Sequence, residues 1–240
     1  MKKRAITLII AAITAISATT AAAQQTEQKD KYVYIDTAIH EFDKITVTSP
    51  INVVYKQSSD STKLLRIYAP EQMKDKIKTE VKDGKLTISC NRGFKNDFNV
   101  IIVYAYSKTL TAVECCGGAV FTATEPVCGA YISLKVTGQS QIRCTKLNYD
   151  EVKGRRGIGQ GDLIIGGKTT KANLSILGRG EINAENLISK EVSCRMFGKG
   201  DIGCHVNETI EVRSIGRGCA YCKGDLPISG KHDKIREMVK

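Results

Sequence analysis

Three carboxylates with a regular spacing are the residues of this chain best suited by type to do chemistry. Asp162, Glu181 and Asp201 lie 19 and 20 residues apart. If a repeating fold stacked them, they could bind Ca²⁺ or supply the acid and base that cleave a glycosidic bond. Arg179 and Lys199 come two positions before Glu181 and Asp201, and such mixed rows are more typical of a solvated surface. We therefore expect a non-enzyme with no catalytic residues, and a polysaccharide-cleaving enzyme is the alternative.

The stretch Gly198-Lys199-Gly200-Asp201-Ile202 resembles part of a phosphate-binding loop. A dinucleotide fingerprint needs three glycines between a strand and a helix, and a Walker loop needs Ser or Thr directly after Gly-Lys. Glycine follows Lys199 here, and no helical periodicity follows Ile202. The motif therefore predicts a structural corner, and we expect no cofactor.

The histidines and the C-x-x-C pair do not have the context of a metal or redox site. His40, His205 and His232 show no metal-ligand spacing, so we expect no metal. Cys219 and Cys222 have C-x-x-C spacing, but no thioredoxin-like βαβ pattern surrounds them. Cysteine nucleophile chemistry is therefore not predicted.

The glycine motif recurs, and its period indicates how the chain positions these residues. Steps of 18 to 22 residues separate six copies, which begin at Cys116, Gly138, Gly159, Gly178, Gly198 and Gly216. A period near 20 residues is typical of a solenoid. Each glycine pair then marks a corner between two strands, because glycine permits tight bends and positive φ.

Residues at equal offsets from each corner form apolar columns. Four residues after the first position come Val120, Ile142, Leu163, Ile182, Ile202 and Ala220, and four residues before it come Ala112, Leu134, Leu174, Cys194 and Val212. Alternation with a period of two places these residues on one face of short strands, which points into a core. The third copy breaks phase in the stretch VKGRRGI, which predicts a bulge. The fold class is therefore all-β, a parallel β-helix with coils of about 20 residues.

Cysteine fills several of the inward positions. Cys144, Cys194, Cys204 and Cys222 fall in these columns, where cysteine acts as a small apolar residue. Cys204 and Cys222 share a column on neighbouring coils, and the expected spacing of about 4.8 Å is within the range that disulfides tolerate. In-register parallel neighbours are often poorly angled for a bridge, so we expect most inward thiols to be reduced. The pairing of the nine cysteines stays open.

The chain divides into four segments by composition. Residues 1–23 combine Lys2, Lys3 and Arg4 with an apolar stretch and an Ala-Ala-Ala cleavage site, which predicts a signal peptide. Residues 24–110 are read as irregular N-terminal coils and a cap, with a possible short helix in PEQMKDKIKTEV. Residues 111–230 are the regular coils, and residues 231–240 are a charged C-terminal tail that closes or trails from the other end.

The net charge limits the classes of partner that the protein is expected to bind. The chain carries a formal charge of +11, and removal of the leader leaves a basic mature protein. Export makes nucleic acid an improbable partner, whereas anionic glycans and envelope polymers are compatible with the charge. No later stretch has the roughly 18 apolar residues of a membrane span. We expect a periplasmic, cell-surface or secreted protein, and the sequence does not choose among these or predict the oligomeric state.

Several motifs resemble one family. They are the stretches SPINVVYKQ and YAPEQMKDKIKTEVKDGKLTIS, the corners at Gly159–Leu163, Gly178–Ile182 and Gly198–Ile202, and the closing stretch Ile215–Pro227. The similarity is to the head GIN domain of auto-transporter adhesins, common in Bacteroidetes. The resemblance covers about residues 33 to 230. It implies an exported right-handed β-helix with an adhesive role, and it supplies no catalytic residues. The chain departs from the family where Leu177, Phe197 and Ile215 replace corner serines.

Three outward rows form the predicted binding surface. The first row, one position before the first residue of each corner, contains Ile158, Leu177, Phe197 and Ile215. The second row, one position after that residue, contains Gln160, Arg179, Lys199 and Arg217. The third row, three positions before it, contains Lys135, Arg156, Ser175, Arg195 and Arg213. Exposed apolar patches of this kind mark interaction sites. We predict a binding site of Leu177, Phe197, Ile215, Arg179, Lys199, Arg217, Arg195 and Arg213. The alternatives are that the apolar row is covered by another segment, or that the corner turns it inward, and a purely structural envelope role also stays open.

Overall fold

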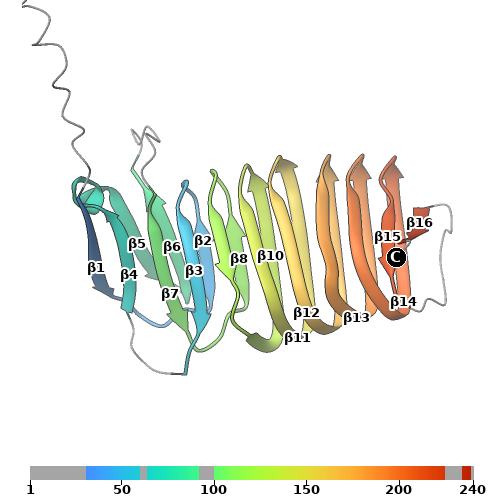
Figure 1. The fold of residues 1–240 in the computed structure, drawn as a ribbon, viewed down its shortest axis with the longest axis horizontal. Coiled ribbons are helices and arrows are strands. Elements are labelled where there is room, and N and C mark those ends of the chain that lie inside the picture. The colour runs from blue at the N-terminus through green and yellow to red at the C-terminus, as the bar shows by residue number, and fades with distance from the viewer. Residues whose placement is uncertain (1–30, 60–63, 92–99, 225–233, 239–240) are drawn as a thin grey trace, which may run out of the picture. The chain divides into compact units, whose positions relative to one another are not determined.

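The computed structural model describes residues 31–59, 64–91, 100–224 and 234–238. The predicted signal peptide lies outside the described residues, as do Asp225–Pro227 of the closing family stretch. Residues 32–240 form one compact unit. The described part of this unit is almost entirely β-strand, and its strands stack in sequence from β8 to β15 (Figure 1).

Successive strands, most of them long, form the regular coils. They are β10 (Val127–Gly138), β11 (Gln141–Gly159), β12 (Asp162–Gly178), β13 (Glu181–Gly198), β14 (Asp201–Gly216) and β15 (Ala220–Lys223). Each strand pairs with the next in parallel. β11 to β14 have 16 to 19 residues each, too many for a single straight rung, so they bend along their length (Figure 1). The result is a β-solenoid of about six turns. The predicted parallel β-helix is confirmed.

The interior columns agree with the sequence pattern over the regular coils. Ile142, Leu163, Ile182 and Ile202 pair in series, and none is more than 1% exposed. The predicted bulge is also present, since Val136 pairs with Arg156 whereas Gly138 pairs with Gly159. One extra residue is therefore accommodated between Arg156 and Gly159. Apolar burial along these columns provides the main driving force for stacking.

The predicted register of the first corner is wrong by one residue. Ile142 pairs with Phe121, not Val120, and Leu134 pairs with Val113, not Ala112. The corner starts at Gly117, whose φ of +69° matches that of Gly138 at +70°. The stretch CGGAV contains two adjacent glycines that both have positive φ, so the glycine pattern alone does not fix where the corner begins.

The N-terminal coils do not stack in chain order. The first coil in sequence comprises β2 (Lys44–Val47) and β3 (Asn52–Gln57). It lies between the coil of β6 (Lys85–Cys90) and β7 (Ile102–Ser107) and the coil of β8 (Ala112–Cys115) and β9 (Val120–Ala123). The chain therefore adds a coil on the outer side of the first coil before it returns to build the regular stack.

Antiparallel strands cover the N-terminal end of the stack. β1 (Tyr32–Ala38) pairs with β4 (Leu64–Pro70), which pairs with β7, and β5 (Ile77–Lys82) pairs with β6. The predicted helix is only the 3₁₀ helix Glu71–Lys76, because the sequence that follows alternates like a strand and forms β5. β4 and β5 therefore cover the strand edges of the outermost parallel coil, which β6 and β7 form.

The C-terminal end adds one short strand to the stack. β16 (Ile235–Glu237) pairs in parallel with β15, and Ile235 is buried over Ala220. Buried apolar residues from Phe42 to Ile235 belong to one hydrophobic cluster. Among the residues that the structure describes, no helix has the length and hydrophobicity to cross a membrane.

We predict that Ile182→Ala lowers the free energy of unfolding by about 2–5 kcal/mol, because its side chain is fully buried and leaves a cavity. Leu177→Ala is the matched control. Leu177 is 47% exposed in the preceding strand, so its truncation should change stability by about 0.5 kcal/mol or less. Urea unfolding of both variants measures the difference. Equal effects would contradict the inward column.

Candidate binding face

The backbone N–H groups at the glycine corners donate hydrogen bonds to carbonyls of the preceding coil. The backbone N–H groups of Lys199 and Asp201 donate to the carbonyls of Gly178 and Gly180, both at 2.9 Å. Arg217 N–H donates in the same way to Gly198 at 2.8 Å. A phosphate loop needs such N–H groups free to cradle the anion. The corner around Lys199 is therefore structural, as the sequence context predicted.

The two glycines of a corner are required for different reasons. Gly198 has a φ of +121°, which L-residues rarely adopt. Gly200 has no such φ, but a Cβ there would lie 2.5 Å from Ile176 Cδ1 and 3.0 Å from the carbonyl oxygen of Gly180. The first glycine makes the bend, and the second lets successive coils approach closely. This close approach places the residues that flank each corner at regular intervals on the outer surface.

The apolar row, defined as Leu177, Phe197 and Ile215, lies exposed at these corners. Leu177 pairs with Phe197, which pairs with Ile215 on the next coil. Their exposed fractions are 47%, 51% and 69%. Within the described part of the chain no segment covers the row, and the corner does not turn it inward. Ile158, at the bulge, is also exposed.

All five predicted basic residues of the binding site are exposed, namely Arg179, Lys199, Arg217, Arg195 and Arg213. Arg195 pairs with Arg213 on the neighbouring coil. Arg213 also forms an ion pair with Glu211, with 2.6 Å between Nη2 and Oε1. The positive charge of this row is thus partly neutralised at Arg213, whereas no ion pair of Arg195 occurs among the described residues.

Arg156 does not belong to the outward row in which the sequence placed it. The bulge shifts the register, so Arg155 pairs with Ser175 in that row, and Arg156 pairs with Ile176 in the buried column. Arg156 is only 4% exposed. Its guanidinium donates to the carbonyls of Gly161 at 2.7 Å and Gly159 at 2.9 Å, and also to that of Arg179. Burial lowers the pKa of Arg156, and the nearby Asp162 carboxylate opposes this shift.

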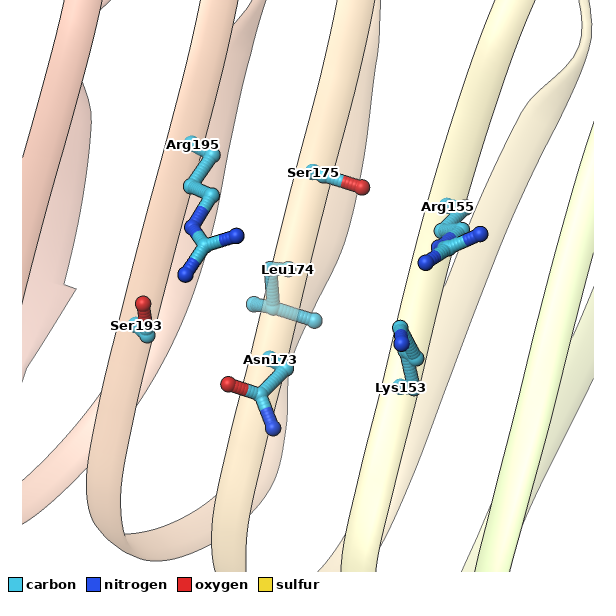
Figure 2. A pocket seen from close by; sticks show the side chains of 7 residues that line it. All are labelled: Lys153, Arg155, Asn173, Leu174, Ser175, Ser193 and Arg195. Carbon is cyan, nitrogen blue, oxygen red and sulfur yellow. The ribbon is translucent and has the colours of Figure 1, made fainter.

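A shallow depression of about 190 Å³ lies beside the apolar row. Its lining comes from β11, β12 and β13 and consists of Lys153, Arg155, Asn173, Leu174, Ser175, Ser193 and Arg195. Figure 2 shows Arg155 and Arg195 on either side of the middle strand, which carries Ser175. We call this feature the basic depression. It lies two residues before the apolar row on the same strands, since Ser175 precedes Leu177 and Arg195 precedes Phe197.

Sequence reasoning identified only part of the basic depression. It singled out Arg195 but missed Lys153, Arg155, Asn173 and Ser193 as site residues. Asn173 and Ser193 lie five positions before Gly178 and Gly198, whereas Lys153, which pairs with Asn173, lies six positions before Gly159. Short side chains beside long basic ones indicate a hollow only when the register is known. The bulge displaced that register by one residue.

The three carboxylates, Asp162, Glu181 and Asp201, lie on the outer side of their strands, where Asp162 and Glu181 are exposed and Asp201 is half-buried. Glu181 pairs with Asp201 on neighbouring coils. Asp201 Oδ1 accepts a hydrogen bond from the Cys219 backbone N–H at 2.8 Å, and Asp162 Oδ2 lies 3.4 Å from Gln141 Nε2. In the described part of the chain, no group of three or more potential ligands could hold a metal ion.

The inward cysteines are free thiols in the core. The structure places all nine cysteines outside disulfides. Cys204 and Cys222 are paired across neighbouring coils, with 3.3 Å between their sulfur atoms. Hydrogen bonding to Cys194 and burial raise the pKa of Cys204, and burial raises the pKa of Cys144 to about 12. These thiols therefore stay protonated and serve as apolar filler.

The stacked coils define the molecule as a β-solenoid with an exposed outer face of apolar and basic rows. The profile of the family described as "Putative auto-transporter adhesin, head GIN domain" matches residues 41–225. The chain belongs to this family. The family name supports an adhesion-like role for an exported or surface protein.

Solved structures share the fold. One described as a "putative adhesin" from Bacteroides fragilis NCTC 9343 is 25% identical, with a TM-score of 0.78 over 88% of this chain and 98% of that one. A second "putative adhesin", from Parabacteroides distasonis ATCC 8503, is 21% identical, with a TM-score of 0.69 over 88% and 95%. A "putative lipid binding protein" from the same organism is 20% identical, with a TM-score of 0.68 over 87% and 95%. No curated protein matches the sequence.

We predict that Arg156→Ala destabilises the protein by about 3 kcal/mol or more, because the carbonyls of Gly159, Gly161 and Arg179, at two successive corners, lose their donor at about 1–3 kcal/mol each where they are buried. Arg155→Ala is the matched control, since it removes the same side chain from the exposed neighbouring position. Thermal and denaturant unfolding measure both variants. If the two substitutions cost the same, the inward placement of Arg156 is wrong.

We predict that alkylation at neutral pH labels the exposed Cys128 rapidly, while Cys144, Cys194, Cys204 and Cys222 react only after unfolding. Mass spectrometry before and after denaturation gives the labelled positions. The raised pKa of Cys144 favours the folded state below the ordinary thiol pKa of 9.0, and this contribution is lost as the pH rises toward about 12. Rapid native labelling of Cys144, or peptides that join Cys204 to Cys222, would contradict the assignment.

Proposed function

We propose that this protein is an exported, non-enzymatic adhesion module that binds anionic glycans or envelope polymers on its outer face. The observation that carries the proposal is the exposed apolar row with basic side chains on both sides. The apolar row of Leu177, Phe197 and Ile215 has a basic row on each side. The basic row that follows it along the strands contains Arg179, Lys199 and Arg217, and the one that precedes it contains Arg195 and Arg213. Membership in an adhesin family supports the same class of function.

The spacing of the rows favours an extended polymer over a small molecule. Paired residues on neighbouring coils repeat about every 4.8 Å, and Leu177, Phe197 and Ile215 occupy three coils in succession. A linear ligand can contact each of them at once. Sugar rings have apolar faces that pack on such side chains, and their acidic substituents meet the basic rows.

The chemistry of the basic residues favours acidic groups on the ligand. Four of the five predicted basic residues are arginines. The planar guanidinium donates two parallel hydrogen bonds to a carboxylate or sulfate, so that it binds them with defined geometry. Because the side chains are exposed, salt must weaken the attraction beyond the screening length of about 8–10 Å.

We predict that Phe197→Ala combined with Lys199→Ala weakens binding of immobilised polygalacturonate and dextran sulfate by about tenfold. The double variant removes an apolar contact and a charge at one corner, and both lie on the surface, so the fold should be preserved. Biolayer interferometry of the mature protein measures affinity at several salt concentrations. Wild-type affinity should fall as salt rises.

The matched control is Ile188→Ala combined with Lys190→Ala. Ile188 is 39% exposed and Lys190 is exposed, and both lie on β13 with Phe197. This pair removes the same kinds of group from a different stretch of the strand and should leave binding unchanged. If both double variants bind like the wild type, or if affinity is insensitive to salt, the apolar row is not the binding site.

A further inference from the structure

The positive charge before the corners is distributed unevenly along the stack. At one end of the row Lys135 forms an ion pair with Glu114, with 2.6 Å between Nζ and Oε1. At the other end Arg213 forms one with Glu211. Between them, Lys153, Arg155 and Arg195 have no ion pair among the residues that the structure describes. The unneutralised charge is therefore concentrated at the basic depression.

Short polar side chains create the space between these cations. Asn173, Ser175 and Ser193 occupy positions at which longer residues stand on other coils, and the depression they leave measures about 190 Å³. Arg155 and Arg195 lie two coils apart on either side of Ser175 (Figure 2). The Asn173 amide donates to Glu151 Oε1 at 2.7 Å. Glu151 is outside the lining, and every charged side chain in the lining is cationic.

We infer that the basic depression is a subsite for a sulfate ester carried by a glycan that lies along the apolar row. The inference rests on the proposed function, because the same glycan chain would contact Leu177 and Phe197. Lys153 and Arg155 approach the space from β11 and Arg195 approaches it from β13, on the two sides of β12, and the side chains of Ser175 and Ser193 also line it. A tetrahedral sulfate has three terminal oxygens and can accept from Arg155, Arg195 and Lys153 together.

A carboxylate would form fewer hydrogen bonds with the three cations of the basic depression than a sulfate ester. A planar carboxylate is satisfied by the fork of one arginine, which would leave the second arginine and the lysine without a partner. Phosphate groups share the tetrahedral shape and occur on lipid headgroups and nucleic acids. The narrow apolar row, one side chain per coil, fits a linear chain better than the plane of a membrane.

The test compares polymers that differ in their acidic group. Dextran sulfate carries sulfate esters, polygalacturonate carries carboxylates and unmodified dextran is neutral. We expect the wild-type protein to bind dextran sulfate at least about tenfold more tightly per charged group than polygalacturonate, because three charged donors meet the sulfate that occupies the depression. Arg155→Ala combined with Arg195→Ala should remove this preference, with unchanged thermal unfolding because both residues are exposed.

Two further variants separate geometry from charge. Arg155→Lys with Arg195→Lys keeps the charge but loses the planar forks, and it should recover only part of the preference. Arg143→Ala with Lys168→Ala removes two exposed cations from other stretches of β11 and β12. This control should retain the preference for sulfate, because those residues lie outside the lining.

The outcomes separate the subsite from the proposed function. If the wild type binds both acidic polymers equally per charged group and the arginine variant weakens both to the same extent, the sulfate subsite is wrong while the proposed function stands. If neither polymer binds, the proposed function fails as well. Equal or tighter binding of vesicles containing phosphatidylglycerol, or of RNA, with the same dependence on Arg155 and Arg195, would overturn the assignment to a sulfated glycan.

Discussion

The structure depends on one constraint, the in-register hydrogen bonding of each coil to the next through the glycine corners. At the corner of β13, Lys199 and Asp201 donate to the carbonyls of Gly178 and Gly180 on the preceding coil. Such bonds form only if successive backbones approach closely, which the lack of a side chain at Gly200 permits. The left-handed φ of Gly198 turns the chain into the next strand. At this corner, two glycines at a spacing of two therefore serve two physical needs.

The constraint extends from the corners to the core and the surface. Once the corners are in register, alternate residues must point inward, and Ile142, Leu163, Ile182 and Ile202 form one buried column. The residues between them must point outward, whatever their chemistry. Phe197 and Ile215 are exposed for this reason, although their side chains are apolar. Because burial elsewhere holds the fold together, the outer rows are free to serve binding.

The bulge in β11 shows how one extra residue changes both surfaces. It moves Arg156 into the buried column, where its guanidinium bonds to corner carbonyls in place of an apolar contact. It also brings Arg155 into the outward row beside Ser175. The basic depression thus depends on the same irregularity that buries Arg156. A cation in the core and a cationic hollow on the surface have a common structural origin.

The amino-acid sequence by itself determined the repeating architecture, because the glycine spacing and the period of two are local patterns that each coil repeats. Parity relative to the corner also assigned Leu177 and Phe197 to an outward row, but the alternative that the corner turns them inward was decided only by the structure, in which both are exposed. The sequence could not determine the register at CGGAV, where Gly117 and Gly118 compete for the same corner and only pairing with β11 decides. The tertiary structure alone decided the order of the N-terminal coils, because the placement of β2 between β6 and β8 depends on edge pairing between distant segments. It alone decided the basic depression too, since side chains on three coils become neighbours only when the stack has formed.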